Sequence, residues 1–154
     1  MTLEDWHRFT WLRKNDTTVV EISQLMDVAA RGLRDAKIEA LSVDGRFQHA
    51  YDAALQCCMV ALRAEGYAVA KGPGHHKRGI ESLPLSLGAE WKDTSDHIEH
   101  CSRLRGQSVY ERTGVVSLND VEELIETVEA LFSHLGSWLK NEHPELVNQA
   151  EGLQ

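Results

Sequence analysis

Apolar residues recur at helical spacing in four long stretches of this chain, and no stretch shows the sustained alternation of a half-buried strand. Thr18 and Ser117 each stand at the start of such a stretch, with an acidic residue three positions later, as in a helix-capping motif. The pattern therefore predicts an all-α fold without a sheet, an up-and-down bundle of four long helices plus short ones. The predicted long helices are 18–41, 46–65, 91–110 and 117–143.

Turn-forming residues separate these helices. The run 42–45 breaks the first from the second, and Gly66 ends the second. Two short helices are predicted at 3–13 and 75–83, the latter after the glycine-rich turn 70–74 and ended or kinked by Pro84. We expect one domain over 1–143 and a tail over 144–154.

The composition is that of an ordinary soluble protein, with 42% hydrophobic and 26% charged residues among 154. The sequence has no apolar run of the roughly 20 residues that a membrane span needs, and its N-terminus does not resemble a signal peptide. Its three cysteines form no C-x-x-C pair, so they are expected to be buried thiols. These features predict a cytoplasmic protein that has no membrane contact and needs no cofactor or metal.

A net charge of −8 argues against general, non-specific DNA or RNA binding, which needs a basic surface. The basic groups are nevertheless concentrated in two short segments. An acidic protein with one basic pocket suits a specific phosphate-bearing ligand. The segments are Lys71, His75, His76, Lys77 and Arg78, and then Arg103, Arg105 and Arg112.

Arg105 lies on the apolar side of the predicted helix 91–110, with Ile98 and Cys101. An unpaired guanidinium is very costly to bury, so this arginine needs a carboxylate, a phosphate or a second subunit as its partner. It is therefore either a structural residue paired with an internal acid or part of a ligand site that also includes Arg103.

The histidines have competing interpretations. His75 and His76 begin a short helix and are either part of a basic surface loop or, with Arg103 and Arg105, ligand-binding residues. His97 and His100 have the spacing of two metal ligands, but the helical pattern puts both on the solvated face. We therefore expect no metal site.

Taken in order, several segments resemble the HEPN superfamily of prokaryotic helical domains over roughly residues 20–140. The segment 103–110, Arg-Leu-Arg-Gly-Gln-Ser-Val-Tyr, carries much of this resemblance. The others are 40–47, 50–55, 74–76, 83–84 and the acidic-then-apolar last helix.

The resemblance implies a helical bundle that usually forms a homodimer. Active HEPN members are metal-independent ribonucleases with an arginine, a polar residue, about three variable positions and then a histidine. In this chain Arg105 matches the arginine, whereas Gly106 and Tyr110 replace the polar residue and the histidine. Non-cleaving members bind nucleotides or RNA, or pair with a nucleotidyltransferase in toxin–antitoxin systems. In some of those pairs a motif tyrosine receives a nucleotide, so Tyr110 becomes a candidate acceptor.

Three hypotheses remain open at this point. The first is a dimeric binding domain for RNA or a nucleotide, with a possible nucleotidyltransferase partner. The second is a metal-independent endoribonuclease that uses Arg105 and a relocated base, His75, His76 or His100. The third makes Arg105 a purely structural residue.

Overall fold

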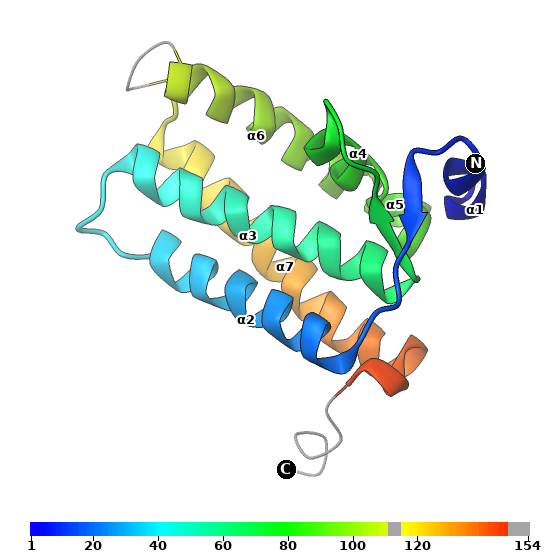
Figure 1. Ribbon diagram of the computed structural model, residues 1–154. Helices are drawn as coiled ribbons and strands as arrows, with labels where there is room; N and C mark the ends of the chain where they lie inside the picture. The colour runs from blue at the N-terminus through cyan, green and yellow to red at the C-terminus, as the bar shows by residue number, and fades with distance from the viewer. Residues whose placement is uncertain (111–114, 148–154) are drawn as a thin grey trace.

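The computed structural model describes residues 1–110 and 115–147, and the side chains of 1–106 and 115–147. Its described part is mostly helical, which confirms the predicted helical class (Figure 1). The long helices are α2 (Val19–Ala36), α3 (Val43–Ala64), α6 (Lys92–Tyr110) and α7 (Leu118–Glu142). The shorter helices are α1 (Leu3–Arg8), α4 (His75–Glu81) and α5 (Leu83–Leu87), with 3-10 turns η1 (Ala89–Trp91) and η2 (Pro144–Leu146).

Capping side chains explain where the long helices begin. Thr18 caps α2 by accepting a hydrogen bond from the Glu21 amide, and Ser117 forms a reciprocal capping box with Asp120 at the start of α7. Both predicted starts are confirmed. Ser42, which was expected to break a helix, instead caps α3 through the Gly45 amide, so α3 begins earlier than predicted.

The predicted end of the first long helix at Leu41 was too late. Helix α2 stops at Ala36, and its C-cap, Lys37, donates its amide to the Arg34 carbonyl. The amides of Ile38 and Leu41 then close separate tight turns, on the carbonyls of Asp35 and Ile38. Ile38 and Leu41 are apolar and extend the helical spacing through this connection, so the predicted helix was too long, although both residues are exposed.

Helix α3 is the centre of the molecule and contacts α2, α6 and α7. Small residues bring α2 close to it: a Cβ atom placed on Gly32 would lie 3.1 Å from the Ala53 Cβ and 3.0 Å from the His49 carbonyl oxygen. Helix α7 covers α3 with the apolar face predicted from its spacing. The buried residues of that face are Val121, Leu124, Ile125, Val128, Leu131, Leu135 and Leu139.

The prediction that the chain has no sheet was wrong. Strand β1 (Leu12–Lys14) pairs antiparallel with β2 (Tyr67–Val69), with Arg13 opposite Ala68. The predicted helix 3–13 accordingly ends at Arg8, as α1. Strands of three residues are too short to show the alternation that identifies a strand in sequence.

The short elements pack over one end of α3 (Figure 1). Leu3, Trp6 and Leu12 form a small core with Leu62 and Tyr67. The guanidinium carbon of Arg78, on α4, lies 3.7 Å from the centre of the Trp11 ring, which connects α4 to the N-terminal segment.

The end of α4 and the C-terminal segment differ in detail from the predictions. Helix α4 ends at Glu81, and α5 begins at Leu83, so Pro84 lies in the first turn of α5 rather than ending α4. In the segment predicted as a tail, Leu146 is buried in the core. Within 1–110 and 115–147, no helix combines the length and apolar character that crossing a membrane requires.

Candidate functional site

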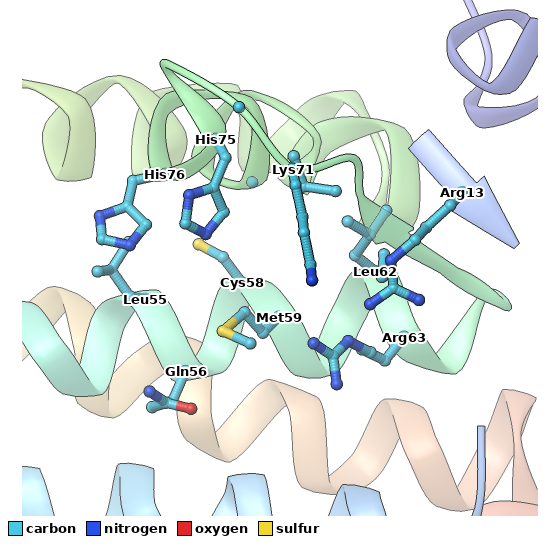
Figure 2. Close-up of a pocket in the computed structure, with 14 residues that line it drawn as sticks. Arg13, Leu55, Gln56, Cys58, Met59, Leu62, Arg63, Lys71, His75 and His76 are labelled. Carbon is cyan, nitrogen blue, oxygen red and sulfur yellow. The ribbon is translucent and has the colours of Figure 1, made fainter. Parts of the chain in front are cut away.

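A pocket of about 420 Å³ lies between α3, the two-stranded sheet and α4 (Figure 2). Its floor is apolar, because Leu55, Met59 and Leu62 recur at three- and four-residue spacing along one face of α3. Val69 on β2 extends this floor. The other lining residues are Arg13, Gln56, Cys58, Arg63, Ala68, Lys71, Gly72, His75, His76 and Gly79.

Basic side chains surround this apolar floor. Figure 2 shows Lys71, His75 and His76 extending from the 70–76 segment towards α3, with Arg13 and Arg63 nearby. Within the part of the chain that the structure describes, no carboxylate is among the lining residues. The pocket thus combines positive charge with an apolar surface, a pairing that suits an anion with an apolar or planar body.

The two arginines differ in their own partners. Arg63 donates to Glu21 at 2.8 Å, and both side chains are largely buried, so its charge is already compensated. Arg13 is exposed, and among residues 1–110 and 115–147 its guanidinium makes only a long 3.4 Å hydrogen bond, to the amide oxygen of Asn15. Lys71 is exposed and takes part in no ion pair within the described chain. Arg13 and Lys71 are therefore the cations best able to bind a ligand.

Two glycines shape the loop that carries Lys71 and the histidines. Gly72 has φ +143° and Gly74 has φ +76°, both in the range that side-chain-bearing residues rarely adopt. These conformations turn the chain back over α3 after β2, and His75 starts α4 directly after Gly74. The glycine-rich turn predicted at 70–74 is thus what places the imidazoles at the pocket.

The imidazole rings of His75 and His76 lie 4.5 Å apart, measured between ring centres. Partial burial lowers the pKa of His76, and the positive charges of His75 and Arg105 lower it further, against an opposing effect of Asp52. This clustering of like charges favours the neutral imidazole. A bound anion would relieve the repulsion.

Arg105 has an amide rather than a carboxylate as its partner. Its Nε donates to Oε1 of Gln48 at 2.9 Å, and the Gln48 amide nitrogen donates to Asp52 at 2.8 Å. The guanidinium carbon lies 5.3 Å from the centre of the Tyr51 ring, which is buried. Within the described chain Arg105 forms no ion pair, and it is half-buried beside His76 rather than in the lining of the pocket.

None of the other predicted residues of segment 103–110 is shown to line the pocket. Arg103 is exposed, pairs with Glu99 at 3.2 Å and is not among the residues that line the pocket. Gly106 lies near the end of α6. The side chain of Tyr110 lies outside the described residues, so its predicted role stays a prediction.

The prediction that His97 faces solvent was wrong. Its Nδ1 atom lies 2.8 Å from the hydroxyl of Thr127 on α7, and the residue is half-buried. His100, one turn later, is exposed as expected. The described residues contain no group of three potential metal ligands.

The sequence analysis missed Arg13 and Arg63 as residues of the pocket. Arg13 reaches it only because β1 pairs with β2, a contact between segments more than 50 positions apart. Arg63 could have been noticed, because it follows Leu55, Met59 and Leu62 along the same helix.

Comparisons of this chain with protein-family models, with curated proteins and with solved structures found no match.

Proposed function

We propose that this protein is a HEPN-like helical binding domain whose pocket holds a phosphate-bearing ligand, a nucleotide or a segment of RNA. One observation carries the proposal. Five basic or imidazole side chains from four segments of the chain surround an apolar floor, and none of the described residues that line the pocket is a carboxylate.

The chemistry of the pocket matches that ligand class. Arginine and lysine bind phosphate oxygens through short, charge-assisted hydrogen bonds. The aliphatic floor formed by Leu55, Met59, Leu62 and Val69 offers a surface for a nucleobase. Its volume of about 420 Å³ lies within the usual range of small-molecule sites.

The proposal extends to the assembly. The four long helices form an up-and-down bundle of HEPN type, and the protein works as a homodimer. A nucleotidyltransferase is the proposed partner, with Tyr110 as the residue that would receive the nucleotide. The basis for these statements is the resemblance of the sequence together with the predominantly helical fold.

Calorimetric titration with adenosine 5′-monophosphate and with a short single-stranded RNA tests the binding function. Lys71→Gln should weaken binding about tenfold or more, the effect of losing one charge-assisted contact. Arg31→Gln is the matched control, because Arg31 is an exposed cation on α2 that does not line the pocket. The proposal fails if neither ligand binds, or if both variants weaken binding equally.

A second candidate function, a metal-independent ribonuclease, is favoured by the proximity of His76 to Arg105. A neutral imidazole can accept the proton of a ribose 2′-hydroxyl, and a guanidinium can stabilise negative charge at phosphorus. Incubation of RNA with the protein and a chelator should then give cleavage that His76→Gln and Arg105→Gln each abolish. Cleavage that survives both changes would reject this assignment.

A further inference from the structure

The positive charge of the pocket is divided between its two ends. Figure 2 shows the head groups of Arg13, Arg63 and Lys71 towards one end and the imidazoles of His75 and His76 towards the other. The thioether of Met59 lies between the two groups, on the floor. The apolar floor therefore carries two groups of basic side chains, one towards each end.

The length of the floor supports this division. Leu55 lies below His76, and Arg63 follows eight positions later on α3. At about 1.5 Å per residue the two positions are separated by roughly 12 Å along the helix axis. The long side chains of Arg13 and Lys71 at one end reduce the distance that a ligand must span to less than this separation.

Different residues determine the electrostatic environment at each end of the pocket. At one end Glu21 compensates Arg63, so Arg13 and Lys71 supply the available charge. At the other end His76 experiences the charge of Arg105 in addition to that of His75. Each end therefore offers donors to one phosphate: Arg13 and Lys71 at one end, and at the other the imidazoles, whose charged form a bound phosphate would favour.

We propose that the pocket binds one nucleoside through phosphates on both its 5′ and 3′ sides, with the base on the floor between two phosphate subsites. This inference rests on the proposed binding function and specifies its ligand. The shared chemistry is a nucleoside flanked by two phosphates, which occurs either as an internal nucleotide of single-stranded RNA or as a free nucleoside 3′,5′-bisphosphate.

The test is calorimetric titration of the full chain with three probes: adenosine 5′-monophosphate, adenosine 3′-monophosphate and adenosine 3′,5′-bisphosphate. The bisphosphate should bind about tenfold or more tightly than either monophosphate, because it gains one charge-assisted contact. If the bisphosphate binds no more tightly than the better monophosphate, there is only one phosphate subsite and the inference is overturned.

Two variants then assign the subsites. Arg13→Gln should weaken one monophosphate and leave the other unchanged, and His76→Gln should do the reverse. In both variants the advantage of the bisphosphate should disappear. Equal weakening of both monophosphates by each variant would show a single shared anion site and overturn the inference.

Two controls and one further probe make the result interpretable. Arg13 is exposed and His76 is mostly exposed, with only part of its ring buried, so thermal melting should show both variants folded, and Arg31→Gln should bind all three probes as the unmodified protein does. If neither the three probes nor a short RNA binds, the proposed binding function itself fails. If the mono- and bisphosphates bind equally, only the inference of two subsites fails.

The trinucleotide UpApU distinguishes the two sources of the ligand. If it displaces the bisphosphate, the site accepts an RNA chain; if it does not while the bisphosphate binds tightly, the ligand is a free nucleotide.

Discussion

A guanidinium on the apolar side of a helix needs a partner, and the side-chain amide of Gln48 serves Arg105 in this role. An amide oxygen satisfies a hydrogen bond but does not neutralise a charge. Arg105 therefore contributes positive potential to its surroundings, where it lowers the pKa of His76. Arg63 is the contrasting case, because Glu21 neutralises it directly.

We expect Arg105→Met to change the free energy of unfolding by about 1 kcal/mol or less, because one hydrogen bond from a half-exposed guanidinium to an uncharged amide is lost and an apolar stem is retained. Arg63→Met is the matched comparison and should cost about 1–3 kcal/mol, because it leaves the partly buried Glu21 without its cation. Urea denaturation of both variants measures the difference. A larger loss for Arg105→Met than for Arg63→Met would contradict this account.

His76 should respond to ligand through its own ionisation. In the free protein its pKa lies below the ordinary histidine value, because of burial and of repulsion from His75 and Arg105. A bound phosphate favours the charged imidazole and should raise that pKa. Binding then takes up protons, so affinity should increase as the pH falls through the interval between the two pKa values.

An NMR titration of the His76 ring protons, with and without adenosine 3′,5′-bisphosphate, which would fill both proposed subsites, measures both pKa values. The His76→Gln spectrum assigns the signal. An unchanged or lower pKa in the presence of saturating nucleotide would show that the phosphate does not contact this ring.

At the scale of helices and strands, the sequence predicted what local interactions determine. The caps at Thr18 and Ser117 and the stop at Gly66 depend on residues within a few positions, and the structure has them where predicted. The end of α2 and the strand β1 were missed. Apolar residues in the 37–41 connection imitate helical spacing, and β1 exists only because β2 lies beside it.

The loop before α4 should be sensitive to a single methyl group. Gly74 has φ +76°, so Gly74→Ala should destabilise the protein by about 1 kcal/mol through backbone strain and weaken ligand binding by displacing His75 and His76. Gly136→Ala is the matched control. Gly136 lies within α7, a Cβ there meets no atom within 4 Å, and alanine should stabilise the helix by about 0.5–1 kcal/mol.

Thermal unfolding and calorimetric titration of the two alanine variants measure these opposite effects. A stabilised Gly74→Ala variant would mean that the loop does not need the left-handed conformation.

At the scale of the whole molecule, the helical class could be predicted from spacing, whereas the pocket could not. His75, His76 and Lys71 were identified as a basic cluster from their proximity in sequence. Arg13 comes from the N-terminal segment, and the apolar floor comes from α3. No local pattern shows that these segments meet, because packing of α4 and pairing of the strands decide it.

The proposed homodimer makes a direct prediction about mass. Light scattering at micromolar concentration should give about twice the chain mass of 17.3 kDa. The physical reason is that Arg105 lacks a carboxylate partner within the described chain, and a two-fold interface would bring acceptors from a second copy. A mass equal to one chain would refute the dimer and leave the binding pocket unaffected.

The pairing of β1 with β2 has a consequence for the timing of folding during synthesis. Arg13 emerges from the ribosome early, but its strand has no partner until Tyr67–Val69 has been made, and His75 and His76 follow later still. A nascent chain that ends before α4 therefore lacks part of the pocket and could not hold the proposed ligand, however well α2 and α3 have already paired. The proposed ligand, if present in the cell, would bind only chains that already contain α4. It would therefore stabilise the folded form and not the shorter nascent chains.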